Sequence, residues 1–213
     1  MPRPRPARLA AKKKTLAASE QDPVARAVWQ LTTAWADPTQ FVFVDETSSS
    51  IALTRRYARA PRGVRARGQA PRNYGQPTTL IAALAPTGLG AAMTLPGAAN
   101  TAAFTVYVRE LLCPTLRPGQ IVILDNVSFH RATAIRALIE GVGCQLWFLP
   151  PYSPDFAPIE HAFAKLKTAL RAVGARTQAA LEAAIAAALD LVTAADAHGW
   201  FRHCGYALPA QSL

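Results

Sequence analysis

The 213 residues carry a formal net charge of +10, with 51% hydrophobic and 17% charged residues. These proportions are typical of a folded globular protein and exclude a disordered chain. The sequence lacks the run of about 18 apolar residues that a membrane span needs, and its basic N-terminus lacks the apolar segment of a secretory signal. We therefore expect a cytoplasmic protein with no membrane partner. The excess of Lys and Arg indicates a nucleic-acid partner, unless the source simply has Arg-rich proteins.

The charge is distributed unevenly along the chain. Residues 1–40 carry seven basic and three acidic side chains, which gives +4, and residues 41–75 carry seven Arg and two acids, which gives +5. Residues 121–160 carry two Arg and four acids, which gives −2. An acidic region inside a basic protein is what a metal-dependent nuclease needs. The three cysteines form no C-x-x-C pair, so we expect neither a zinc site nor a disulfide framework.

The first 40 residues are expected to form a basic arm and a short helix. Residues 1–22 alternate Arg with Pro and then bring three consecutive Lys, a pattern typical of a solvated linker or of an arm that touches DNA phosphates. Residues 23–36 are predicted to be helical and to end before Pro38. The prediction depends on four apolar residues at helical spacing: Val24, Val28, Leu31 and Trp35.

Short apolar runs rich in β-branched and aromatic residues predict the strands of a sheet. We expect buried strands at residues 41–45 (FVFVD), 121–125 (IVILD) and 144–149 (CQLWFL), and a further strand at 51–58. A hairpin is expected from residues 78–85 and 89–95, on either side of a Pro-Thr-Gly turn. The Arg-, Gly- and Pro-rich residues between 59 and 77 predict a long loop.

Helical periodicity predicts the remaining elements. Helices are expected at residues 101–112, 131–140 and 158–171, and one long helix follows Thr177. The tail is expected to pack back on the core through Trp200, Phe201 and Tyr206. This order predicts an α/β fold in which helices flank a mixed sheet. We expect two parts: the basic arm and short helix at residues 1–40, and a folded domain at residues 41–213 with its core at about 41–171.

Three carboxylates fall at the positions where an α/β sheet collects its ligands. Asp45 and Asp125 each close an apolar strand, and Glu160 lies in the first turn of the helix after the next strand. Alone, each acid has an ordinary structural explanation, such as capping a turn or complementing a helix dipole. Together they would repel one another without a cation, and two Mg²⁺ ions would relieve that repulsion and assist phosphoryl transfer.

The sequence around these acids resembles a known family. The segments FVFVDET, IVILDNVSFHR and FLPPYSPDFAPIEHAFAKLK are similar to the three catalytic blocks of the mariner-like bacterial insertion-sequence transposases of the DDE superfamily. In that family thirty-four residues separate the second acid from the Glu, and here residues 126–159 are thirty-four. The resemblance covers about residues 15–207, including the Arg-rich loop and the F-R-x-C-G-Y tail.

The resemblance implies a fold, a chemistry and partners. It implies a ribonuclease-H-like fold in which Asp45, Asp125 and Glu160 hold two Mg²⁺ ions, with Mn²⁺ as a substitute. The implied activity is metal-dependent cleavage and transfer of DNA strands in transposition of an insertion sequence. The implied partners are element ends and target DNA, and a second copy of the chain in the active complex. The setting is the bacterial cytoplasm, in association with the nucleoid.

Further residues match the family's motifs. Glu46 matches an acid after the first Asp and is expected to have a structural role. Asn126 either orients a ligand or forms a turn, and His130 either contacts the scissile phosphate or is a cap or surface residue. The chain departs from the family at Ala157, where Asn usually precedes the Pro of the P-I-E block.

Basic residues are expected to contact DNA at two places. The long loop matches a family region that acts as a clamp on DNA or a partner subunit, although a solvated loop would look similar. Its arginines are Arg55, Arg56, Arg59, Arg62, Arg65, Arg67 and Arg72. On the helix of Glu160, the basic residues Lys165, Lys167 and Arg171 either bind flanking DNA or form an exposed face.

Family members usually carry an N-terminal helix-turn-helix region, and the 40 residues before the first predicted strand leave no room for one. We expect either that a separate reading frame encodes this region or that the chain is a truncated copy. The alternative to an enzyme is therefore a remnant that binds DNA or a full-length partner without catalysis. A general ribonuclease-H-like nuclease is a third hypothesis, but it does not explain the P-P-Y-S-P-D block.

Overall fold

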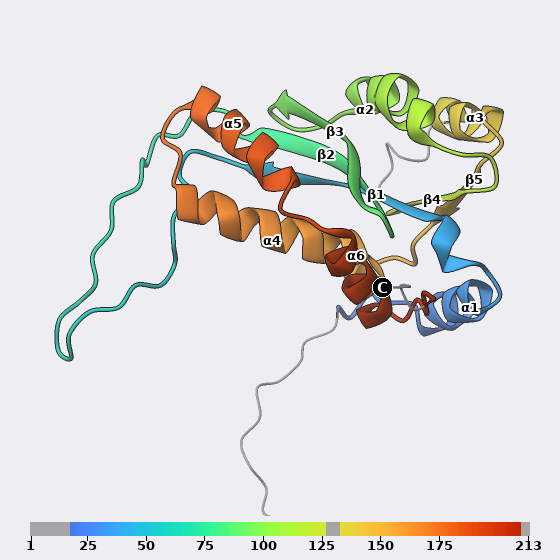
Figure 1. Ribbon diagram of the computed structural model, residues 1–213, viewed down its shortest axis with the longest axis horizontal. Helices are drawn as coiled ribbons and strands as arrows, with labels where there is room; N and C mark the ends of the chain where they lie inside the picture. Colours follow the sequence, from blue (N-terminus) through green and yellow to red (C-terminus); the bar gives the residue numbers. More distant parts are fainter. Residues whose placement is uncertain (1–17, 127–132, 210–213) are drawn as a thin grey trace, which may run out of the picture.

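A five-stranded mixed sheet forms the centre of the fold (Figure 1). The computed structural model describes residues 18–126 and 133–209. The strand order is β3-β2-β1-β4-β5. The strands are β1 (Phe41–Ser49), β2 (Thr78–Ala85), β3 (Gly88–Pro96), β4 (Ile121–Leu124) and β5 (Gln145–Phe148).

Half of the sheet is antiparallel and half is parallel. β1 pairs with β2 and β2 with β3 in antiparallel register, and the β2–β3 hairpin turns where it was expected. β1 and β4, and β4 and β5, are parallel. Parallel neighbours need crossover connections, and helices supply them here. The predicted α/β class and mixed sheet are therefore confirmed.

Helices cover both faces of the sheet (Figure 1). α4, α5 and α6 lie on one face, whereas α2 and α3 lie on the other. α1 lies beside the body, next to the segment that follows α6, where Trp29 donates a hydrogen bond to the Tyr206 hydroxyl. The bounds are α1 (Pro23–Ala34), α2 (Thr101–Tyr107), α3 (Thr133–Gly141), α4 (Pro158–Val173), α5 (Gln178–Leu189) and α6 (Ala194–His203). One π-helical turn, Val108–Leu112, extends α2.

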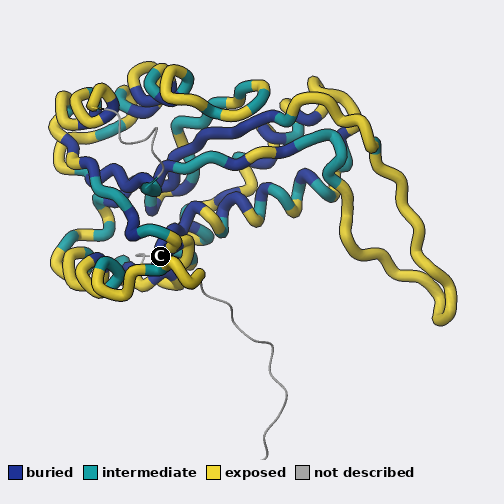
Figure 2. Tube along the Cα trace, turned by 180° about the vertical axis from the view of Figure 1, so that it is seen from behind, coloured by how far each residue is buried: buried dark blue, intermediate teal, exposed yellow. Residues whose placement is uncertain are grey.

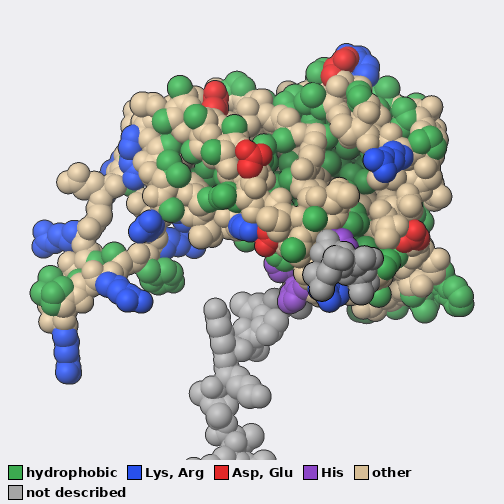
Figure 3. Space-filling view, in the orientation of Figure 1, with side chains coloured by type: hydrophobic (Ala, Val, Ile, Leu, Met, Phe, Trp, Pro, Cys, Tyr) green, Lys and Arg blue, Asp and Glu red, His purple; other side chains and the backbone are tan. Residues whose placement is uncertain are grey.

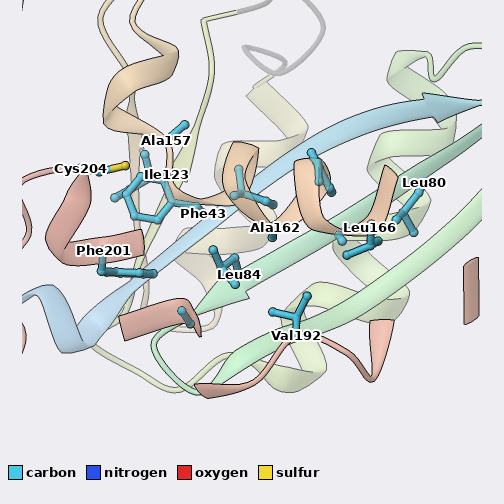
Figure 4. Packing of buried hydrophobic residues seen from close by; sticks show 14 of the residues in the cluster. Phe43, Leu80, Leu84, Ile123, Ala157, Ala162, Leu166, Val192, Phe201 and Cys204 are labelled. Atoms are coloured by element: carbon cyan, nitrogen blue, oxygen red, sulfur yellow. The ribbon is translucent and has the colours of Figure 1, made fainter. Parts of the chain in front are cut away.

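Alternation along the buried strands assigns side chains to the two cores. Phe41 and Phe43 of β1 join the cluster under α4 and α6, together with Ile123 of β4 (Figure 4). Val42 and Val44 belong to the cluster under α2 and α3. Successive strand residues point to opposite faces, so a carboxylate's position in its strand decides which face it reaches. Figure 2 shows the central strands as the most buried part of the chain.

Two predicted elements are wrong in detail. Residues 51–58 form no strand, because β1 itself continues to Ser49 and uses β2 as its partner. The helix after Thr177 ends at Leu189, and a second helix, α6, begins at Ala194 with a capping box between Thr193 and Asp196. The tail therefore packs on the core as a helix, with Phe201 and Tyr206 buried as expected.

The apolar face of α1 lies at the surface. Trp29, outside the predicted apolar set, is the residue of α1 that is buried in the core. The four residues on which the helix was predicted are all exposed: Val24, Val28, Leu31 and Trp35. Their spacing indicated the helix correctly, but the side that meets the body is a different one.

The segment between β1 and β2 projects away from the body as one long excursion (Figure 1). We call residues 50–77 the basic loop. Residues 54–70 are all exposed, and Figure 3 shows Lys and Arg side chains gathered along this projection. The long loop expected from the Arg-, Gly- and Pro-rich composition is confirmed.

Among the described residues, no single helix is both long and apolar enough to cross a membrane. The α5–α6 pair passes that test of length and composition only when its two helices, bent by 80°, are joined.

Candidate active site

Three carboxylates from separate elements line one pocket. Asp45 belongs to β1, Asp125 directly follows β4, and Glu160 lies in the first turn of α4. All three line a cavity of about 410 Å³. The parallel register pairs Phe43 with Ile123, so two residues further along Asp45 comes opposite Asp125 on the same face of the sheet. The structure thus brings the three predicted acids together.

The sequence predicted that Asp45 ends its strand, but β1 continues beyond it to Ser49. β1 continues because its edge toward β2 stays paired, with Asp45 opposite Ala82 and Ser49 opposite Thr78. On the other edge, β4 ends at Leu124. The pocket therefore opens where the shorter strand stops and the longer one runs on.

The environment of Asp45 opposes a negative charge. Burial raises the pKa of its carboxyl group to about 7, and the charges of Glu46, Asp125 and Glu160 act in the same direction. A hydrogen bond from the Glu46 backbone N–H to Asp45 Oδ1, 2.7 Å long, lowers the pKa and only partly offsets these effects. A half-buried carboxyl group that resists ionisation beside two more acids is a natural place for a cation.

The donor set suits a hard divalent cation. Carboxylate oxygens are the ligands that Mg²⁺ and Mn²⁺ prefer. Within residues 18–126 and 133–209, however, no three His, Cys, Asp or Glu side chains lie close enough together to hold a metal ion as they stand. The three carboxylates have the chemistry that a divalent cation requires, and they share one pocket. To coordinate the cation jointly, they must approach one another.

Asn126 and Glu46, two of the three accessory residues expected from the sequence, lie in different environments. Asn126 lines the pocket directly after Asp125. Glu46 follows Asp45 in β1 and so points to the other face, where burial and the charge of Glu46 raise the pKa of Tyr107. His130 lies outside the described residues.

α4 begins without a side-chain cap. Ala157 occupies the cap position before Pro158 and has no side-chain atom that accepts a hydrogen bond. The residue is buried, with 4% of its surface exposed, and belongs to the main core cluster (Figure 4). A carboxylate in the first turn, such as Glu160, is favoured by the helix dipole, so the sequence still provides partial compensation.

An arginine of α1 holds the loop that leads to Glu160. The Arg26 guanidinium donates to both carboxylate oxygens of Asp155, at 2.9 and 2.6 Å, and to Ser153 Oγ at 2.8 Å. It also lies over the Phe156 ring, 4.2 Å from the centroid. This pairing lowers the pKa of Asp155 below its usual value. A bidentate pair fixes orientation as well as distance, so α1 shapes the entry to α4.

The chain's tail holds the same loop from the core side. Trp29 Nε1 donates to the Tyr206 hydroxyl at 3.1 Å, and that hydroxyl donates to the Phe156 carbonyl at 2.7 Å. Gln21 donates to the Tyr152 carbonyl at 2.7 Å. Segments from both ends of the described chain therefore position the loop between β5 and α4.

Of the predicted DNA-binding residues, the arginines of the basic loop lie away from the carboxylates, and the other three lie on α4 with Glu160. The seven arginines of the basic loop are exposed. The loop leaves the body beside the C-terminal end of α4 (Figure 1), and Val173 at that end is about 20 Å along the helix from Glu160, at 1.5 Å per residue. On α4, Lys165 is bound to Asp196 of α6 at 2.6 Å, whereas Lys167 and Arg171 are partly exposed.

The base of the basic loop is tied to the body by one arginine. Arg176, just after α4, donates to the carbonyls of Ile51 and Leu53 at 2.9 and 3.0 Å, and to that of Gln69 at 3.5 Å. These carbonyls lie on the outgoing and returning parts of the loop, so one side chain connects both.

The sequence analysis did not find Arg26, Tyr206 or Arg176. Arg26 is a single basic residue on a helix, and its partner Asp155 is more than a hundred positions away. The F-R-x-C-G-Y tail contains Tyr206 and was noted as part of the resemblance, but its contact to Phe156 is visible only in the fold.

A strand order of β3-β2-β1-β4-β5 with carboxylates at the centre is that of a ribonuclease-H-like fold. The profile of the family described as DDE superfamily endonuclease matches residues 40–182, more than half of the chain. The chain belongs to this family. No curated protein matches it.

Solved transposases have the same fold. The crystal structure of a pre-cleavage Mos1 transpososome superposes with a TM-score of 0.71 and 18% identity, over 92% of this chain and 63% of that one. The catalytic domain of Mos1 mariner transposase gives a TM-score of 0.65 and 17% identity, over 91% of each chain. This chain thus spans less than two thirds of the length of the transposase in the transpososome and matches its catalytic domain.

Proposed function

We propose that this chain is the catalytic part of a transposase that cuts and joins DNA strands with the help of divalent metal ions. The observation that carries the proposal is the shared pocket of Asp45, Asp125 and Glu160 in a member of the DDE superfamily endonucleases. Burial and mutual repulsion raise the pKa of Asp45, which fits a site completed by positive charge.

Asp45, Asp125 and Glu160 would hold the metal ions, two Mg²⁺ or Mn²⁺, in this pocket. When bound, such ions activate the attacking oxygen and stabilise charge on the leaving oxygen of the phosphate ester. Asn126, on the pocket wall, would orient one of the carboxylates or a substrate oxygen. Arg26 and Tyr206 keep the Glu160 turn in place through Asp155 and the Phe156 carbonyl.

The proposed substrate is DNA, held by basic residues outside the pocket. The net charge of +10 and the exposed arginines of the basic loop supply sequence-independent phosphate contacts. Lys167 and Arg171 on α4 would add contacts, whereas Lys165 is already paired with Asp196. His130 stays a proposed contact of the scissile phosphate.

The proposed assembly is a homodimer on two element ends, and the Mos1 paired end complexes with Mg and Mn have this fold. The motif blocks support an insertion sequence of a bacterium, whose chromosome would be both donor and target. A helix-turn-helix domain, if separately encoded, would provide recognition of the ends. The division at residue 40 stays a prediction.

A second candidate function is a remnant that binds DNA or a full-length partner without cutting. The observation in its favour is Ala157, which leaves the first turn of α4 without a side-chain cap. Lost caps cost about 1 kcal/mol, which loosens but rarely abolishes a helix start. The enzyme is therefore the better supported candidate.

The test is a strand-cleavage assay on DNA that carries the element's terminal repeats, with the end-recognition domain added and with Mg²⁺ or Mn²⁺. The proposal expects metal-dependent nicking at the repeat ends, with no cleavage of an RNA–DNA hybrid. Tight DNA binding without cleavage would favour the remnant, and cleavage of the hybrid would favour a general ribonuclease-H-like nuclease.

A further inference from the structure

α1 carries an apolar stripe that the body of the protein does not cover. Val24, Val28 and Leu31 of α1 are 71, 56 and 66% exposed, and Trp35, the residue that caps its C-terminal end, is 92% exposed. Figure 2 shows α1 as largely exposed at the margin of the fold. The opposite side of the helix is occupied, because Trp29 is buried and Arg26 holds Asp155. Several exposed apolar side chains along one side of a helix indicate an interaction site.

The spacing of the stripe shows what kind of surface fits it. The four residues follow one another at intervals of four, three and four, which is the d-a-d-a spacing of a coiled-coil seam. A helix that packs on a broad globular core shows a wider apolar face than this narrow stripe. The complementary surface is therefore another helix that lies nearly parallel or antiparallel to α1.

The residues beside the seam allow that helix to come close. They are small and uncharged: Ala25, Ala27, Thr32 and Ala34. Coiled-coil helices usually carry charged residues here, which select partners by sign. These flanking positions therefore carry no charge that would repel an identical helix.

The order of side-chain sizes favours an antiparallel pair of α1 helices. In a two-fold arrangement centred between Trp29 and Gln30, Val24 faces Trp35 of a second copy and Val28 faces Leu31. The largest side chain then lies against a small one, and the helix dipoles run in opposite directions. A parallel pair would place Trp35 against Trp35.

We propose that α1 is an interface through which two copies of this chain associate, as an antiparallel two-helix seam. This goes beyond the proposed function, which expects a dimer but not the surface that forms it, and it does not depend on the carboxylate site. Four seam residues per copy bury less than the ~800 Å² per partner of a standard interface. Association is therefore weak in solution and strengthens where DNA holds two copies together.

The test is sedimentation velocity of the whole chain over a range of concentrations, for the parent and two surface variants. Leu31→Glu places a charge in the middle of the seam. Val173→Glu is the matched control, because Val173 is also exposed, at 64%, but lies at the end of α4. Both positions face solvent in a single copy, so both variants should fold, and circular dichroism melts check this.

The proposal expects reversible self-association of the parent and of Val173→Glu, and at least about tenfold weaker association of Leu31→Glu. A parent that stays monomeric to the limit of solubility would overturn it. Equal association of all three proteins would place the interface elsewhere.

Cysteine pairing tests the orientation. The double variant Val28→Cys/Leu31→Cys should form disulfide-linked dimers under mild oxidation, and Leu31→Cys alone should form few. Efficient cross-linking of Leu31→Cys alone would replace the antiparallel seam with a parallel one, because only a parallel pair brings the two Leu31 positions together.

Discussion

The carboxylate pocket and the basic loop lie at opposite ends of α4 and are built in opposite ways. The pocket is set among buried strands and is held by hydrogen bonds from α1 and the tail. The basic loop is exposed along most of its length and is tied down at its base by Arg176. The difference indicates a division of work, in which the pocket requires fixed geometry and the loop requires only charge and reach.

Amide substitutions in the pocket provide the largest expected effect. Asp125→Asn and Glu160→Gln, made separately, should each abolish metal-dependent strand cleavage, because an amide keeps the size but not the charge that holds a cation. DNA affinity, measured in parallel by fluorescence anisotropy, should stay within a few-fold of the parent's. Cleavage by either variant at the parental rate would remove that acid from the site.

Neutralising part of the basic loop should weaken DNA binding and leave cleavage intact, which is the reverse of the effect expected for the amide substitutions. Arg59→Ala/Arg62→Ala/Arg65→Ala should weaken DNA binding at least about tenfold at 0.1 M salt. The slope of the logarithm of the binding constant against the logarithm of the salt concentration should become shallower by about 0.9 for each phosphate that the protein no longer neutralises. Cleavage at saturating DNA should be unchanged. The matched control is Arg109→Ala/Arg117→Ala/Arg136→Ala, which removes the same charge elsewhere. An equal decrease of affinity in both would show that net charge, not the loop, matters.

The Arg26 contact tests whether the pocket depends on fixed geometry. Arg26→Ala should slow cleavage several-fold, up to about tenfold, because a small displacement of a positioned group is costly. The free energy of unfolding should fall by about 1–2 kcal/mol, since the Asp155 side of the pair is partly exposed. Arg26→Lys keeps the charge without the bidentate geometry. Full activity in the Lys variant would show that charge alone suffices.

The raised pKa of Asp45 predicts a smaller, pH-dependent effect on stability. The folded state holds this proton more tightly than the unfolded chain, so its contribution to stability is complete below pH 3.8 and is lost as pH rises through about 7. Without metal, Asp45→Asn should therefore melt at a higher temperature than the parent at pH 8. The difference should disappear at pH 4, where both side chains are neutral. A variant less stable than the parent at pH 8 would contradict the repulsive environment.

The sequence predicted the local features of the fold better than its long-range contacts. Apolar runs ending in Asp45 and Asp125, and the Pro158 helix start, follow from short patterns that each element contains in itself. The continuation of β1 through polar residues depends on pairing with β2, which no local pattern reveals. The break before α6 was missed because Ala-rich periodicity continues across it.

Contacts made by single residues could not be predicted at all. Arg26 finds Asp155, and Arg176 finds the base of the loop, only because the fold brings distant segments together. The exposed stripe of α1 is the reverse case: its spacing predicted the helix, but only the structure shows that the body leaves it uncovered.

The most direct test of the central claim is Mn²⁺ binding, followed by electron paramagnetic resonance, for the parent, Asp125→Asn and Glu160→Gln in the presence of DNA. If the three carboxylates form one metal site, the parent binds two ions per chain and each variant loses at least one, with DNA affinity retained. Unchanged binding of Mn²⁺ by both variants would contradict the account, because the pocket would then not be the place where the metal is held.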